Sequence, residues 1–177
     1  MKAKSKILRE VEREKKEKSQ RNEVLVFIQQ IFCLARRTAL RISDLFQRSQ
    51  QLASIGETTK SNDDFEKAYE IAKEIPDDFL RNKAFISIIE GLIRLGNLKK
   101  SIELAEEIQD PLYRDKGFKI VIKGLIEKDD LKRAKELVRE VEDNIIRAES
   151  LILIGRKSKN IRDIEAVSYT HLTLPTN

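Results

Sequence analysis

Three kinds of residue in this 177-residue sequence have the type and spacing to do chemistry. Two acidic pairs, Asp77-Asp78 and Asp129-Asp130, offer carboxylate oxygens of the kind that bind a hard cation. Arginines that recur every 33 residues offer guanidinium groups that bind phosphate or carboxylate. This row consists of Arg48, Arg81, Arg114 and Arg147. Catalysis that uses a thiol or an imidazole would need the one cysteine or the one histidine.

Neither of these two residues favours catalysis. Cys33, as a lone cysteine in an apolar run, excludes an internal disulfide and a multi-cysteine metal site and predicts a buried structural thiol. His171 lies in 167–177, a stretch that departs from the charged helical style and resembles the translation of a transposase-type sequencing adapter. We interpret 167–177 as a non-native tail, with the natural chain continuing beyond Ala166. The alternative, a genuine disordered tail, gives the histidine no role either.

No catalytic signature accompanies these residues. The sequence contains no P-loop, no GxGxxG, no HExxH and no cluster of cysteines and histidines. Asp77-Asp78 and Asp129-Asp130 fall where helices need caps, and capping explains them better than a bound cation does. The sequence therefore predicts a protein that is not an enzyme and that holds no metal or cofactor.

The elements that position these residues belong to an internal repeat. A shift of 33 residues brings four segments into register, about 32–60, 64–95, 97–128 and 130–160. Small and larger apolar residues recur at spacings of three, one and three, which places them on one face of a first helix. These columns are Ala35, Ala68, Ser101 and Ala134; Thr38, Ile71, Leu104 and Leu137; Ala39, Ala72, Ala105 and Val138; and Ile42, Ile75, Ile108 and Val141.

An aspartate column marks the start of a second helix in each segment. Its members are Asp44, Asp77, Asp110 and Asp143. Aspartate suits the N-cap because its carboxylate accepts otherwise unpaired backbone N–H groups, and Pro111 suits the first helical position. The arginine four residues later is expected to pair with this aspartate or with the preceding carbonyls, as a ladder in a stacked array. The alternative is a row of arginines that binds ligand phosphates or carboxylates.

The second helix is expected to bury three apolar columns and to end at the polar turns Gly96-Asn97 and Asp129-Asp130. The columns are Phe46, Phe79, Leu112 and Ile145; Leu52, Phe85, Phe118 and Leu151; and Ile55, Ile88, Val121 and Ile154. Each unit is thus a predicted hairpin of two helices of about 12 to 16 residues. One hairpin cannot bury its apolar face alone, so the hairpins must stack.

The outer units are irregular, as capping units often are. The polar stretch 56–61 replaces an apolar half-helix, so the second helix of the first unit is expected to end early and lead through a loop to a cap at Ser61, Asp63 or Asp64. Residues 23–33 are interpreted as a degenerate half-unit that packs Val26, Phe27 and Ile31 on the first hairpin. The link from Arg147 to Ile161 is three residues shorter than its counterparts.

The net charge of +5 comes from one end of the chain. Residues 1–21 hold nine Lys/Arg against four Glu, whereas the remainder holds 26 of each sign. We interpret 1–21 as a charged helical arm with a solvated surface, the alternative being an arm that binds RNA or an acidic partner. The chain has neither a run of about 18 to 20 apolar residues nor a signal-peptide pattern, which predicts a cytoplasmic protein with no membrane partner.

Two stretches resemble a known repeat family. Residues 96–105, from Gly96-Asn97 to Leu104-Ala105, resemble the turn and second helix of a tetratricopeptide repeat, and 129–137 repeat the pattern. The resemblance covers about 32–160. The period is 33 rather than the family's roughly 34, and the family's Trp and Gly-Tyr elements are missing, so the broader tetratricopeptide-like class fits better. The resemblance implies an all-α fold over 22–166, a right-handed superhelical solenoid of antiparallel helix hairpins.

The same resemblance implies a concave surface lined by the helix before each Gly-Asn or Asp-Asp turn, where these families bind peptides or protein surfaces. Carried onto this chain, the positions are Lys83, Ser87, Glu90, Arg94, Lys116, Lys119, Lys123 and Glu127. An ordinary solvated helix face is the alternative for each. We therefore expect a non-enzymatic scaffold for a protein or peptide, with an RNA-binding helical-repeat protein as the second hypothesis. Few aromatic residues lie outside the expected core columns, which weakens the RNA hypothesis.

Overall fold

The structure is a computed structural model that describes residues 2–158 and the side chains of 13–158. Over this range the chain forms eight helices and no strand, which confirms the predicted all-α class. None of these helices is both long and apolar enough to cross a membrane. The predicted tail 167–177, its His171 and the end of the fourth unit lie outside the described residues. The chain divides into two compact units between Arg41 and Ile42.

The first unit contains one helix, α1 (Lys2–Ala39), of 38 residues. It runs unbroken across the predicted boundary between 1–21 and 22–166, because residues 2–39 contain no glycine or proline to end it. Within this unit, the side chains of Val26, Phe27 and Ile31 are 53%, 61% and 48% exposed, and their packing on the first hairpin stays a prediction. Cys33 is also exposed rather than buried. No second helix in this unit is available to cover these side chains.

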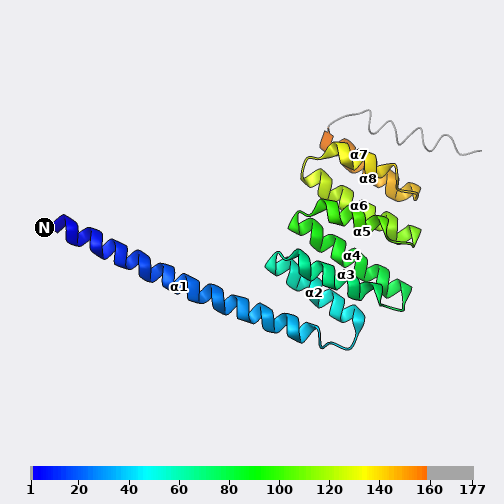
Figure 1. Cartoon of the computed structure of the whole chain (residues 1–177). Helices are drawn as coiled ribbons and strands as arrows, with labels where there is room; N and C mark the ends of the chain where they lie inside the picture. Colours follow the sequence, from blue (N-terminus) through cyan, green and yellow to red (C-terminus); the bar gives the residue numbers. More distant parts are fainter. Residues whose placement is uncertain (1, 159–177) are drawn as a thin grey trace, which may run out of the picture. The chain divides into compact units, whose positions relative to one another are not determined.

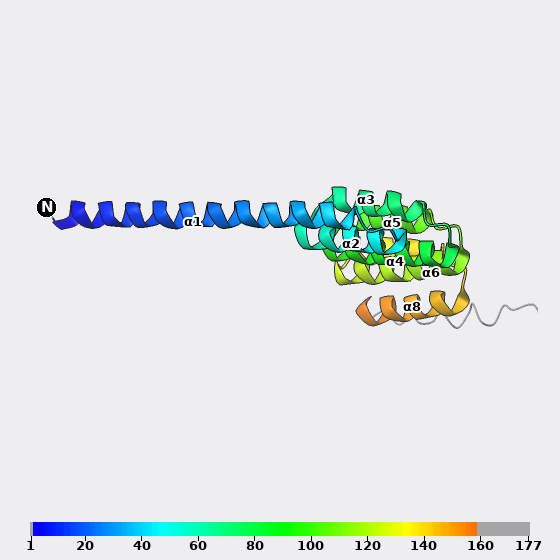
Figure 2. The ribbon, with the colours of Figure 1, turned by 90° about the horizontal axis from the view of Figure 1, so that it is seen from below.

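The second unit is built from two layers of helices (Figures 1 and 2). Four long helices pack side by side in one layer: α2 (Leu45–Thr59), α4 (Asp78–Leu95), α6 (Pro111–Glu127) and α8 (Asn144–Ser158). Three short helices each lie across two successive long ones: α3 (Asn62–Lys73), α5 (Leu98–Glu106) and α7 (Leu131–Val138). The two helices of a hairpin therefore differ more in length than expected, because α5 and α7 have only nine and eight residues.

The repeated aspartates and arginines both satisfy backbone groups at the start of the long helices. Each aspartate is an N-cap whose carboxylate accepts a hydrogen bond from the backbone N–H three residues later. These aspartates are Asp44, Asp77, Asp110 and Asp143. Three of the arginines donate to the carbonyl six residues earlier: Arg48 to Ile42, Arg81 to Ile75 and Arg147 to Val141. Arg114 instead pairs with Glu142.

The turns between long and short helices use left-handed residues. Gly96 ends α4 at φ 85°, and Asn97 caps α5; Asp129 takes φ 60° after α6, and Asp130 caps α7. The expectation that the second helix of the first unit ends early is wrong, because α2 continues through the polar stretch to Thr59. The threonine hydroxyls there bond to the carbonyls four residues earlier, and the buried Gly56 lets α2 and α3 approach closely.

The core lies between the two layers. The small residues of the short helices are fully buried: Ala68, Ala72, Ser101, Ala105 and Ala134. Long-helix side chains such as Ile88, Val121 and Ile154 are also buried, each at most 1% exposed. Burying one such aliphatic side chain stabilises the fold by roughly 1.5 to 3 kcal/mol. Small residues in the short layer therefore allow large ones from the long layer to fill the space between them.

Candidate functional site

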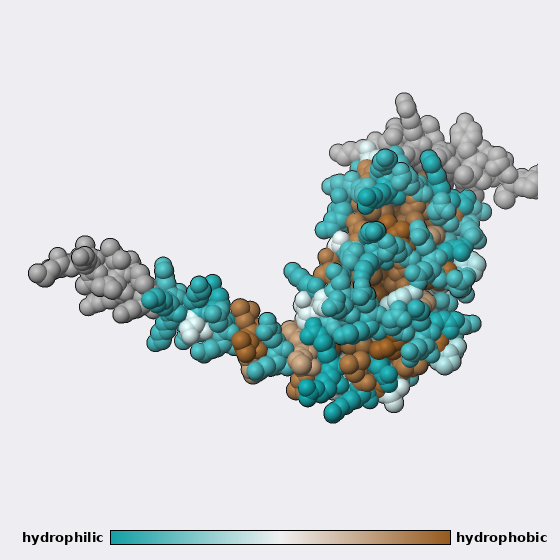
Figure 3. Space-filling view, in the orientation of Figure 1, coloured by the Kyte–Doolittle hydropathy of each residue, from teal (hydrophilic) through white to brown (hydrophobic). Residues whose placement is uncertain are grey.

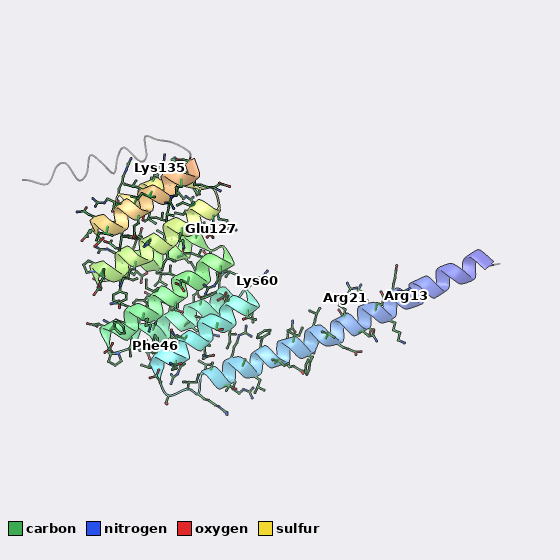
Figure 4. All side chains as sticks on the ribbon, turned by 180° about the vertical axis from the view of Figure 1, so that it is seen from behind. Arg13, Arg21, Phe46, Lys60, Glu127 and Lys135 are labelled. Carbon is green, nitrogen blue, oxygen red and sulfur yellow. The ribbon has the colours of Figure 1, made fainter. Side chains whose placement is uncertain are left out.

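The eight binding positions expected from the sequence lie on the neighbouring long helices α4 and α6, and we call them the long-helix face. Lys83, Ser87, Glu90 and Arg94 lie on α4, and Lys116, Lys119, Lys123 and Glu127 lie on α6. Spacings of three and four residues keep each set on one side of its helix. Figure 4 views the second unit from behind and labels Glu127 at the end of α6. Because α4 packs on α6, the structure brings the two sets onto one layer.

On α4, Arg94 is committed to a contact with the neighbouring helix. Its Nε and Nη2 donate to the two carboxylate oxygens of Glu57 on α2, at 2.6 and 2.9 Å. This hydrogen bonding raises the pKa of Arg94, while partial burial acts in the opposite direction. Glu90 lies 4.0 Å from the same guanidinium group. Arg94 therefore joins α2 to α4 and already holds the kind of group that a ligand carboxylate would supply.

On α6, the lysines differ in what they contact. Lys119 forms an ion pair with Glu149 of α8 and so joins α6 to α8. Lys123 and Glu127 are exposed, and neither forms an ion pair with another described residue. Lys116 places its Nζ 4.6 Å from the centre of the Tyr113 ring. Two of the eight expected positions thus connect helices, and the exposed lysines are better placed to meet a partner.

A row of exposed apolar side chains was missed by the sequence analysis. Phe79, Leu112 and Ile145 are 58%, 50% and 70% exposed, and Phe46 is half-buried. We call these four residues the apolar ridge. They occupy the same repeat position in the first turn of α4, α6, α8 and α2, and Figure 4 labels Phe46 at this end of the layer. Their expected place in the core is therefore wrong.

Helix geometry explains the error and provides the signal that could have found the ridge. A spacing of six residues, as between Phe79 and Phe85, turns a helix through about 240°, so the two side chains point about 120° apart. Phe85 is 7% exposed because it faces the short helices, and Phe79 consequently cannot face them. Only spacings of three, four or seven residues predict a shared face.

Aromatic rings and lysines alternate along the apolar ridge. The Lys83 Nζ lies 6.0 Å from the Phe46 ring centre and 5.9 Å from that of Phe79. Phe79 in turn packs edge-to-face on Tyr113, with ring centres 6.2 Å apart at an interplanar angle of 83°. Lys116, the repeat counterpart of Lys83, lies over Tyr113. The first turns of α2, α4 and α6 thus form a continuous aromatic and cationic surface.

The short helices leave clefts between them on their own side of the unit. One, of about 150 Å³, lies between α3 and α5 with Ile88 and Leu92 at its floor. Burial and the hydrogen bond that Tyr69 donates to Glu107 at its rim raise the pKa of the tyrosine. The equivalent cleft between α5 and α7 has a mixed acidic and basic rim. Figure 3 shows apolar residues exposed between hydrophilic ones in the second unit.

These surfaces present groups that can bind a ligand. Asp77 and Asp130, one from each acidic pair, act as helix caps, and Asp78 pairs with Arg81. Among the described side chains, no group of three or more histidine, cysteine, aspartate or glutamate residues is placed to hold a metal ion. The long-helix face and the apolar ridge instead offer exposed apolar area together with positive charge, which are the components of a macromolecular interface.

Comparison with known proteins found no match: no family model, no curated protein and no solved structure resembles this chain at a significant level.

Proposed function

We propose that this protein is a cytoplasmic, non-enzymatic scaffold of the tetratricopeptide-like class that binds a protein or peptide on the long-helix face and the adjoining apolar ridge. One observation carries the proposal: Phe79, Leu112 and Ile145 are at least half exposed at the same repeat position on three adjacent helices. Single exposed apolar residues are ordinary, whereas an aligned row is typical of an interaction surface. Burying one such side chain in a complex contributes roughly 1.5 to 3 kcal/mol.

A difference in spacing between the layers supports a curved stack. Successive long helices pack directly on one another, whereas among the described residues the backbones of successive short helices stay farther apart. A stack bends so that its closer-spaced layer lies on the inside. We therefore propose a right-handed superhelical solenoid whose concave side is lined by the long helices. The resemblance to tetratricopeptide repeats implies ligand binding on this same side.

The proposal is tested by selecting a displayed random-peptide library on the full chain and mapping the bound peptides by hydrogen exchange. We expect selected peptides to protect α4 and α6. Lys99→Glu on α5, where the side chain is 87% exposed, serves as a surface control that leaves binding unchanged. A selection that yields no binder, or binders that protect only α3, α5 and α7, would contradict the proposal.

RNA binding is the second candidate, and one observation favours it. Phe79 and Tyr113 lie beside Lys83 and Lys116, and aromatic rings flanked by cations form stacking platforms for single-stranded RNA. The aliphatic members of the ridge, Leu112 and Ile145, offer no such platform, which favours a protein partner. A gel shift with generic RNA that weakens with salt and is lost in Phe79→Ala would reverse this preference.

A further inference from the structure

Lys83 and Lys116 differ from most of the other cations on the long helices. Arg94, Lys119 and Lys157 each pair with a carboxylate on a neighbouring helix or turn. Lys83 and Lys116 form no ion pair with any described residue. The Lys83 ammonium group lies beside two rings of the apolar ridge, and that of Lys116 lies over Tyr113, which packs on Phe79. The ridge therefore combines exposed apolar area with two positive charges that have no anionic partner.

The acidic groups near this surface are already engaged. Asp77 and Asp110 each accept a backbone N–H as helix caps, and Asp78 pairs with Arg81. Glu149 occupies the repeat position of Lys83 and Lys116 on α8, where Lys119 neutralises it. A ligand carboxylate could therefore pair with the ammonium groups of Lys83 and Lys116 over α4 and α6, whereas α8 presents a glutamate at the same repeat position.

The spacing of the ridge restricts the shape of its ligand. Neighbouring packed helices lie about 8 to 10 Å apart, so ridge residues at the same repeat position recur at about that interval. A polyproline-II segment rises about 3.1 Å per residue with three residues per turn, so every third side chain points the same way at intervals of about 9.3 Å. In a β-strand, residues three apart point to opposite sides. The interval thus matches an extended segment of the polyproline-II type.

We infer that the apolar ridge binds an extended acidic peptide segment with an apolar side chain at every third residue, whose carboxylates meet Lys83 and Lys116. The apolar side chains pack between Phe46, Phe79 and Leu112, and the segment crosses the long helices near their first turns. This inference rests on the proposed scaffold function and specifies the class of partner.

The experiment uses the full chain and three fluorescein-labelled peptides, with binding measured by fluorescence polarisation. The first peptide repeats Leu-Glu-Pro four times, the second repeats Leu-Lys-Pro, and the third has the composition of the first with its leucines at every second position. We expect the first to bind at least about tenfold more tightly than the other two. Phe79→Ala should weaken its binding about tenfold or more, because an aromatic anchor is removed.

The double variant Lys83→Glu/Lys116→Glu provides the decisive comparison. It should reverse the preference, so that the Leu-Lys-Pro peptide becomes the tighter ligand. Lys99→Glu on the short helix α5, where the side chain is 87% exposed and lies outside the long-helix face, is the control and should leave the preference unchanged. Thermal unfolding followed by circular dichroism verifies that each variant folds, as expected for exposed side chains.

The outcomes separate this inference from the proposed function. Equal affinities for the three peptides, or a preference that survives the double lysine variant, overturn the acidic-segment inference. If library peptides nevertheless protect α4 and α6, the scaffold proposal stands with a partner of different chemistry. If the library also yields no binder on those helices, the scaffold proposal fails as well.

Discussion

Asp115 is a charged residue placed inside the second unit, with 1% of its surface exposed. Its carboxylate accepts hydrogen bonds from the backbone N–H groups of Glu142 and Asp143, at 3.0 and 2.6 Å. These two groups lie just before α8, which Asp143 caps. A side chain of α6 therefore holds the start of α8, and removing it would leave two part-buried N–H groups without this acceptor.

We expect Asp115→Ala to lower the free energy of unfolding by about 1 to 3 kcal/mol, because two part-buried N–H donors lose a charged acceptor. Asp78→Ala is the control: its side chain is 81% exposed, and its surface ion pair with Arg81 contributes little. Urea denaturation followed by circular dichroism measures both variants. Equal effects of the two substitutions would show that Asp115 does not hold α8.

Ionisation of Tyr69 is expected to change the stability of the fold at alkaline pH. Burial first, and then the hydrogen bond to Glu107, raise its pKa above the ordinary value of 10.0. Its contribution to stability is complete below that value and is lost as pH rises, because the unfolded chain releases the phenolic proton first. Between about pH 9 and 11, the Tyr69→Phe variant should therefore lose less stability than the unsubstituted protein. Urea midpoints across that range test this, and an unchanged slope would contradict it.

At the scale of the helices, α4 and α6 can pack closely because α6 has a glycine where the two helices meet. A Cβ added at Gly124 of α6 would lie 2.6 Å from Cγ2 of Ile93 on α4, too short for a real contact. Glycine costs a helix interior about 1 kcal/mol relative to alanine. The helix pair accepts this cost because α4 and α6 otherwise could not pack at this distance.

Gly124→Ala should therefore destabilise the fold by up to about 2 kcal/mol, since overpacking outweighs the gain in helix propensity. In an Ile93→Ala background, which removes the clashing methyl group, the same substitution should stabilise by up to about 1 kcal/mol. A double-mutant cycle in urea measures this change of sign. Additive effects would mean that Gly124 does not set the distance between the helices.

At the scale of the second unit, each helix contacts only its near neighbours. Among the described residues, α4 packs on α2, α3, α5 and α6, whereas α8 packs only on α6 and α7. Stability in such an array is approximately a sum over hairpins and the interfaces between neighbours. A local loss of packing should therefore spread only as far as the adjoining helices.

Ile88 on α4 and Ile154 on α8 test this expectation at the same repeat position, with 1% and 0% exposure. Each substitution to alanine should cost about 2 to 5 kcal/mol locally. Hydrogen exchange followed by mass spectrometry should show faster exchange in α7 and α8 for Ile154→Ala, and on both sides of α4 for Ile88→Ala. Uniform acceleration in both variants would indicate one cooperative core instead.

Much of the fold could be predicted because its signals are local. A cap such as Asp77 acts within three residues, and the turn at Gly96 depends on one left-handed residue. Buried columns such as Ile88 and Val121 follow from helical periodicity. Predictions of burial failed where burial depends on neighbouring elements. Phe79 was assigned to the core and Cys33 to a buried site, and both are exposed. Exposure depends on what packs nearby, which a single helix does not specify.

The sequence by itself determined that this chain is helical, with aspartates starting the long helices of its second unit, because helix periodicity and capping are properties of a few consecutive residues. Only the tertiary structure decided which charges pair and which apolar side chains stay exposed. Arg94 meets Glu57 across two helices, while Lys83 meets no carboxylate among the described residues. These pairings join residues far apart in the chain, so they exist only once the helices have packed.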